Sequence, residues 1–166
     1  MKDMKTKELT KLAVLIAMTT VMTMVIHIPT VATNGYINLG DMVVFLSAMI
    51  LGRRGGFIVG SFGSSLADLL LGYTHYIPIT FIVKGLEGYI TGLILDTKIG
   101  KIKPFIATII GGLWMALGYY IAEIFMYGAE AALATIPGNL MQGFVGAVTS
   151  ILLYMALKRT KIANEK

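Results

Sequence analysis

Six long apolar runs follow one another along the chain, with short polar connections between them. They cover residues 9–28, 38–51, 55–72, 78–95, 104–127 and 138–157. Their length and the lack of strict polar–apolar alternation favour helices over strands. A membrane span needs about 20 mostly apolar residues, so the pattern predicts an all-α integral membrane protein. We expect one domain over residues 1–166, a compact six-helix bundle whose short second helix is tilted or begins in the preceding loop.

The composition agrees with a membrane protein and excludes several kinds of chemistry. Charged residues make up 14% of the chain, against about 25% in a typical soluble domain. There is no cysteine, which excludes disulfides, thiolate metal sites and cysteine nucleophiles. The sequence has no P-loop, HExxH zinc motif or dinucleotide fingerprint. We therefore expect no catalytic residues, no metal, no cofactor and no ATP site in this chain.

The basic residues indicate how the chain is oriented in the membrane. Every Lys and Arg except Lys84 falls before or at the start of the first run, after the last run, or in an alternate connection. Because positive charge accumulates on the cytoplasmic side, this pattern predicts that both termini are cytoplasmic. The residues concerned are Lys2, Lys5, Lys7, Lys11, Arg53, Arg54, Lys98, Lys101, Lys103, Lys158, Arg159, Lys161 and Lys166.

Lys84 and Glu87 lie inside the fourth run, three residues apart. A charge at mid-membrane costs about 2.5–3.5 kcal/mol on insertion scales, so such residues normally face a partner or a cavity. One interpretation is a pair within one helix that neutralises itself. The other is a binding site, which the remaining polar residues favour.

The other in-membrane polar side chains fall mainly in the outward halves of the runs or in the outward connections. This asymmetry predicts a pocket that opens outward and holds a small, partly polar, planar ligand. Simpler interpretations stay open: the tyrosines can form an interfacial belt, Asp41 can cap a helix, and His75 can be a solvated loop residue. With Lys84 and Glu87, the candidate site residues are Asn34, Tyr36, Asn38, Asp41, Asp68, His75, Trp114, Tyr119, Glu123, Asn139 and Gln142.

Four segments resemble a known family. They are Ala13-x-x-x-Ala17, INLGDMVVFLSAMILGRRGGFIVGSFGSSLADLLLGY at 37–73, KGLEG at 84–88 and PGNLMQGFVG at 137–146. Together they resemble the S components, the substrate-binding subunits of energy-coupling factor (ECF) vitamin transporters. The resemblance implies a protein of the prokaryotic plasma membrane that captures a vitamin or a vitamin precursor from outside. It also implies two kinds of partner, a transmembrane T component and, through it, two cytoplasmic ATPases.

The same resemblance implies roles for particular residues. Ala13 and Ala17 would dock on the T component, because small residues permit close helix contact. The first outward loop would act as a lid over ligand contacts from that loop and from the fourth to sixth runs. KGLEG after LADLLLGYTHY looks most like members for hydroxymethylpyrimidine or pyridoxine, with thiamin and riboflavin as alternatives. A self-sufficient ion-coupled carrier and an intramembrane enzyme are the competing classes, and the absence of an internal repeat disfavours the carrier.

Overall fold

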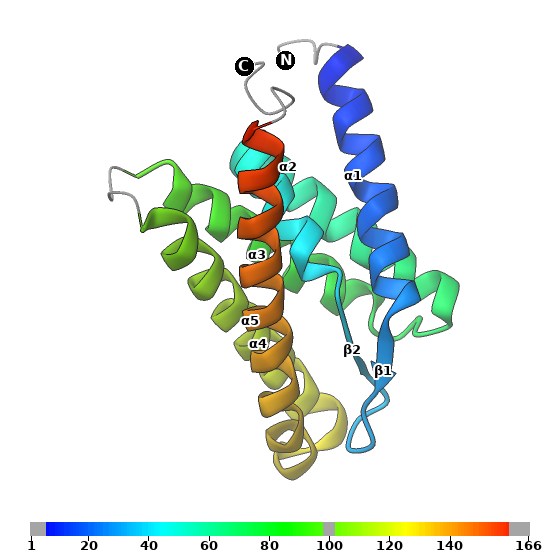
Figure 1. Cartoon of the computed structure of the whole chain (residues 1–166). Coiled ribbons are helices and arrows are strands. Elements are labelled where there is room, and N and C mark those ends of the chain that lie inside the picture. The colour runs from blue at the N-terminus through cyan, green and yellow to red at the C-terminus, as the bar shows by residue number, and fades with distance from the viewer. Residues whose placement is uncertain (1–5, 98–101, 160–166) are drawn as a thin grey trace.

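A computed structural model describes residues 6–97 and 102–159 and confirms an all-α membrane architecture. Five helices are long and apolar enough to cross a membrane, and a short hairpin joins the first two (Figure 1). We expected six helices, and in the described residues there are five. The elements are α1 (Thr6–Val25), β1 (His27–Pro29), β2 (Tyr36–Asn38), α2 (Asp41–Leu71), α3 (Ile77–Leu95), α4 (Lys103–Tyr127) and α5 (Ala129–Arg159).

The difference between five helices and six lies in α2, which is interrupted at Gly52. Gly52 has φ 71° and ψ −172°, a non-helical conformation that glycine adopts without a Cβ clash. The arms 41–51 and 53–71 correspond to the expected second and third runs. At 1.5 Å per residue the first arm is only about 16 Å long. It is therefore too short to cross the bilayer alone, and Asp41 starts it from a fully buried position.

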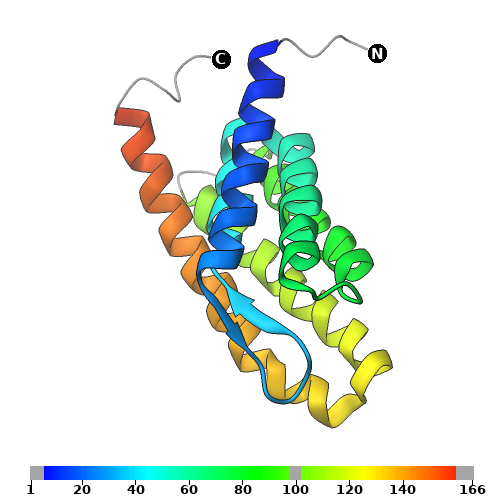
Figure 2. The same ribbon diagram turned by 90° about the vertical axis from the view of Figure 1, so that its right-hand side faces the viewer.

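The hairpin between α1 and α2 was not expected from the sequence. Strands β1 and β2 pair antiparallel with His27 opposite Asn38 and Pro29 opposite Tyr36. Each strand is only three residues long, too short to show a readable alternation. The hairpin lies along one side of the bundle (Figure 2) and carries Tyr36 and Asn38 to the site described below.

The last helix begins earlier than expected. Residues 128–137 were expected to form an outward connection, but α5 starts at Ala129 and continues through Pro137. The turn between α4 and α5 is reduced to Gly128, whose φ is 88°. The helix brings Thr135 to the same wall as Asn139 and Gln142, because the three residues are spaced at one-turn intervals.

Close packing of α2 on α3 fixes the depth of Lys84. A Cβ added to Gly60 would lie 2.2 Å from the carbonyl oxygen of Lys84, and one added to Gly56 would lie 2.5 Å from that of Gly88. The two backbones therefore meet directly, as small residues allow between membrane helices. Lys84 is held at this contact with 1% of its surface exposed.

The described ends of the chain lie at one end of the bundle. The start of α1 and the end of α5 are together there, whereas the hairpin and the α4–α5 turn are at the opposite end (Figures 1 and 2). The two ends meet because α2 turns back at Gly52, so that the chain runs along the bundle in six segments. Of the basic residues used for orientation, Lys2, Lys5, Lys98, Lys101, Lys161 and Lys166 lie outside the described residues.

Candidate functional site

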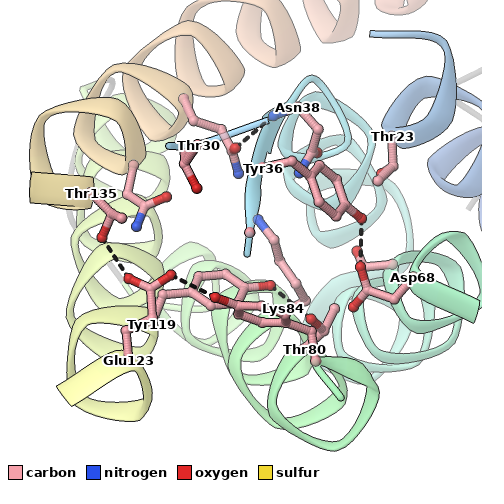
Figure 3. Close-up of a pocket in the computed structure, with 15 residues that line it drawn as sticks. Thr23, Thr30, Tyr36, Asn38, Asp68, Thr80, Lys84, Tyr119, Glu123 and Thr135 are labelled. Carbon is pink, nitrogen blue, oxygen red and sulfur yellow. Dashed lines mark hydrogen bonds between the residues drawn. The ribbon is translucent and has the colours of Figure 1, made fainter. Parts of the chain in front are cut away.

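A small polar cavity lies beneath the hairpin (Figure 3). Its volume is about 30 Å³, counted as space open to the centre of a water molecule. All five helices and the hairpin segment contribute to it, and every lining residue except Gly35 has a polar side chain. The lining residues are Thr23, Thr30, Gly35, Tyr36, Asn38, Ser64, Asp68, Tyr76, Thr80, Lys84, Tyr119, Glu123, Thr135, Asn139 and Gln142.

The structure brings most of the expected site residues together at this cavity. The cavity-lining members of the expected set are Tyr36, Asn38, Asp68, Lys84, Tyr119, Glu123, Asn139 and Gln142. They come from elements far apart in the sequence, so only the fold assembles them. Of these residues, the ones on α3, α4 and α5 line one shared cavity.

The remaining expected residues lie elsewhere. Asn34 and His75 are exposed, in the hairpin loop and in the turn between α2 and α3. Trp114 is half-buried and donates its indole N–H to the Val83 carbonyl at 3.3 Å, away from the lining. Asp41 and Glu87 are fully buried and do not line the cavity. Both accept hydrogen bonds from Lys84 and so hold this lining residue in place.

Lys84 bridges two buried carboxylates. Its Nζ donates to Asp41 Oδ1 on α2 and to Glu87 Oε2, the latter at 2.9 Å. All three side chains are almost completely buried, at 2% exposure or less. The pair within α3 is therefore only half of the arrangement, because Asp41 joins it from another helix. Lys84 is held from below while still facing the cavity.

Gln142 connects this charged cluster to the hairpin. Its Nε2 donates to Asp41 Oδ1 at 3.0 Å, and its Oε1 accepts from the backbone N–H of Asn38 at 2.8 Å. The Asn38 side chain in turn accepts from the N–H of Gly40 at 2.8 Å. The position of β2 is thus tied to α5 and to the start of α2.

Glu123 on α4 holds the opposite end of the hairpin. Its Oε1 accepts from the hydroxyls of Thr33 at 3.2 Å and Tyr76 at 3.0 Å, and its Oε2 accepts from Thr135 at 2.5 Å. Hydrogen bonds to a buried carboxylate are about twice as strong as neutral ones. Glu123 therefore links the hairpin loop, the α2–α3 turn and α5 to α4.

Tyrosine hydroxyls complete the walls. Tyr36 donates to Asp68 Oδ1 at 2.5 Å, visible as a dashed line in Figure 3, and Tyr119 pairs with Thr80 at 3.1 Å. Burial is the largest cause of a raised pKa at both Tyr36 and Tyr76. Both phenols therefore stay protonated at physiological pH and act as donors to Asp68 and Glu123.

Sequence reasoning missed several lining residues. Most are single hydroxyls on otherwise apolar helices, and such residues often bond their own helix backbone, so their pattern does not indicate a site. Tyr76 falls in an expected outward connection and was not among the candidates, although it is buried and its hydroxyl donates to Glu123. The missed lining residues are Thr23, Thr30, Gly35, Ser64, Tyr76, Thr80 and Thr135. Over residues 6–97 and 102–159, no group of three or more His, Asp or Glu is placed to hold a metal ion.

Comparison with known proteins places the chain in a family. The family model described as ECF-type riboflavin transporter, S component, matches residues 3–159. This chain belongs to the S component family of ECF transporters. An S component is a transport subunit and not an enzyme, and it resides in the plasma membrane as a multi-pass protein.

Two relatives of this S component span nearly its whole length. The thiamine precursor transporter HmpT of Lactococcus lactis subsp. cremoris (strain MG1363) is 30% identical over 165 residues, which is 99% of this chain and 95% of HmpT. An uncharacterized protein of Pyrococcus woesei is 35% identical over 140 residues, which is 84% of this chain and 94% of that protein. The S component fold thus extends over the full set of helices described above.

Proposed function

We propose that this S component captures a small, unphosphorylated pyrimidine or pyridine, of the hydroxymethylpyrimidine or pyridoxine class, from outside the cell. The polar lining of the cavity is the observation that carries the proposal. The name of the relative HmpT, a thiamine precursor transporter, supports the pyrimidine end of this range. The T component and two ATPases would then supply the energy for uptake, as the family implies.

The chemistry of the lining favours a ligand rich in hydrogen-bonding groups. Hydroxyl, amide, carboxyl and ammonium groups surround the cavity, and none of its lining residues is aliphatic. Each buried polar group left unpaired costs free energy, so the ligand must offer matching donors and acceptors. Riboflavin is the second candidate, because the matching family model is described for it. Its fused three-ring system and ribityl chain are larger than a single pyrimidine or pyridine ring, so riboflavin would need a much wider opening of the cavity.

The charged groups of the cavity further limit which ligands can bind. Asp68 and Glu123 line the cavity with Lys84 as its one cation, and Lys84 is already engaged by Asp41 and Glu87. The cavity and its supporting cluster therefore hold more carboxyl groups than cationic groups. A phosphate ester would find no unengaged cation in the lining, whereas a heteroaromatic amine would find carboxyl acceptors.

The size of the cavity implies that the hairpin moves. Pockets for small molecules usually enclose about 300–1,000 Å³, far more than the roughly 30 Å³ present here. The hairpin contributes Tyr36 and Asn38 to the lining and is attached through hydrogen bonds to Glu123 and Gln142. Breaking these few bonds would open the cavity outward, so the hairpin is the lid.

Transport measurements in liposomes test whether the protein is a binding subunit. Reconstituted alone, it should retain labelled hydroxymethylpyrimidine or pyridoxine at up to one molecule per chain and accumulate none. With a T component and ATPases it should accumulate ligand when ATP is present. Accumulation by the chain alone, driven by an ion gradient, would contradict the proposal and favour a self-sufficient carrier.

We infer that α1 supplies the surface that docks on the T component. Ala13 and Ala17 are exposed on α1, and Leu9 and Val21, one turn beyond them on either side, are 56% and 54% exposed. The four residues at i, i+4, i+8 and i+12 form one apolar stripe with a shallow centre.

The grouping of the described ends with the basic residues further supports cytoplasmic termini.

Ala17→Trp is expected to prevent assembly with the T component while ligand binding to the isolated S component stays unchanged. A large ring in the shallow centre of the stripe keeps two helices from close approach. Co-purification with a tagged T component measures assembly. Leu113→Trp, at a 53% exposed position on α4, is the matched control and should assemble normally. Equal assembly of both variants would contradict docking through α1.

A further inference from the structure

Three polar atoms on one wall of the cavity have no hydrogen-bond partner. They are Thr23 Oγ1, Ser64 Oγ and Asp68 Oδ2, all shielded from solvent and unbonded within the described part of the chain. The residues are 1%, 3% and 2% exposed. Native proteins seldom leave buried polar atoms unpaired, and each such group calls for a structural or functional reason.

These three atoms belong to the side of the cavity formed by α1 and α2. Ser64 and Asp68 are four residues apart on α2 and share a face, and Thr23 comes from α1. Figure 3 shows Thr23, Tyr36 and Asp68 on the same side of the cavity. Tyr36 already fixes the carboxylate by bonding its other oxygen, Asp68 Oδ1.

On the opposite side, the carboxylate of Glu123 and the amide of Gln142 are already engaged. Both oxygens of Glu123 accept hydroxyl protons, and both ends of the Gln142 amide are bonded. A ligand gains most where it satisfies groups that are otherwise unpaired. The α1–α2 wall is therefore the part of the cavity that determines ligand specificity.

We propose that Asp68, Ser64 and Thr23 form a specificity subsite for an amino-substituted heteroaromatic ring. Asp68 Oδ2 accepts an N–H from the exocyclic amino group. The Ser64 and Thr23 hydroxyls donate to the adjacent ring nitrogen or to a ligand oxygen. This deepens the proposed function and rests on it. It selects an aminopyrimidine over pyridoxine, which has no amino group, and adds α1 and the second arm of α2 to the contacts expected from the hairpin, α3, α4 and α5.

The first test separates ligand recognition from a structural role. Ser64→Ala removes a hydroxyl with no partner, so the ligand-free protein should be equally or more thermostable, while affinity for hydroxymethylpyrimidine falls about 3–10-fold. Ser61→Ala is the matched control, because Ser61 Oγ donates to Phe81 O at 2.8 Å and Ser61 does not line the cavity. It should lower stability and leave affinity unchanged. A Ser64→Ala protein with lower stability and unchanged affinity would overturn the subsite.

The second test uses a pair of ligands, hydroxymethylpyrimidine and its deaminated analogue with oxygen in place of the amino group. The wild-type protein should prefer the amino compound by about 10–100-fold, the range expected for a hydrogen bond to a charged group. Asp68→Asn should reduce the preference to within about 3-fold, because Tyr36 donates to the amide oxygen and leaves an NH2 group, which cannot accept an N–H, at the position of Oδ2. Asp96→Asn, an exposed position whose carboxylate lies 3.8 Å from Arg53, is the control and should keep the full preference.

The outcomes distinguish the two proposals. If the wild-type protein binds neither compound, the proposed pyrimidine function fails and the subsite falls with it. If it binds them without preference, or if Asp68→Asn keeps the preference, the subsite alone is wrong. Should Asp68→Asn not fold, the Ser64→Ala and Ser61→Ala pair decides, since neither substitution removes a charge.

Discussion

Lys84→Met is expected to destabilise the folded protein by about 3–5 kcal/mol, the usual cost of removing one partner of a buried ion pair. Lys84 is the cation between Asp41 and Glu87, and all three are nearly inaccessible to solvent. Without it two carboxylates are left buried with their main donor gone, and Gln142 alone still donates to Asp41. The midpoint of thermal unfolding in detergent and the monomeric fraction after gel filtration measure the loss, and ligand binding should disappear with it.

Two further variants make this result specific. Arg54→Met removes a basic side chain that is exposed and should leave stability within about 0.5 kcal/mol of the wild type. Adding Glu87→Gln to Lys84→Met removes one of the two stranded charges and should restore part of the stability. If Lys84→Met is as stable as Arg54→Met, or if both Lys84→Ala and Glu87→Ala bind ligand normally, the assignment of this cluster to the site is wrong.

Glu123→Gln is expected to loosen the lid without unfolding the bundle. Glu123 accepts from Thr33 in the hairpin loop, from Tyr76 and from Thr135. Hydrogen bonds to a charged group contribute about 1.5–3 kcal/mol each, so neutralising the acceptor should cost about 2 kcal/mol of lid closure. This corresponds to roughly a 30-fold larger open fraction. Hydrogen exchange of peptides covering residues 27–38 measures it, and bound ligand should dissociate faster by a similar factor.

Glu130→Gln is the control for this substitution. Glu130 is exposed in the first turn of α5, so its neutralisation should alter neither hydrogen exchange in the hairpin nor ligand dissociation. Exchange should also stay unchanged in the central turns of α2 and α3 in both variants. If Glu123→Gln raises exchange throughout the bundle and not selectively in the hairpin, Glu123 is a general structural residue and not a latch of the lid.

Hydrophobic patterning predicted most of the helices because the bilayer imposes a length on each of them. The expected runs 9–28, 78–95 and 104–127 match α1, α3 and α4 to within a few residues. The break in α2 fell between two expected runs, where Gly52 stands before two arginines. What the pattern could not show is that this break joins two arms into one element and that the first arm begins at a buried Asp41.

The parts of the fold that patterning missed depend on tertiary contacts. The hairpin strands are too short to carry a period, and their pairing is stabilised by distant residues such as Gln142 and Glu123. The start of α5 was obscured by Pro137, which is usually a helix breaker but here lies within a continuous helix. Neither feature has a local signature strong enough to outweigh the usual preference.

The site residues that the sequence predicted most clearly are those whose side chains carry a charge, because burying a charge in a membrane costs free energy. Lys84, Asp68 and Glu123 stand out because buried charges need partners, and all three line the cavity. Hydroxyls are inexpensive on a membrane helix, so Ser64 gave no signal, and Thr135 fell in a segment expected to be an outward connection. Trp114 was one of the candidate site residues, but its position along α4 directs the indole N–H to the Val83 carbonyl. Side-chain direction follows from helix rotation, which the sequence does not fix.

The central claim is that the polar cavity under the hairpin encloses one small, hydrogen-bonding heteroaromatic molecule. Calorimetric titration of the purified S component, without T component or ATPases, with hydroxymethylpyrimidine, pyridoxine, thiamin and riboflavin tests it most directly. The structure predicts one bound molecule per chain, with hydroxymethylpyrimidine or pyridoxine binding more tightly than riboflavin. Tighter binding of riboflavin than of either small ring, or no binding of any of the four, would contradict it.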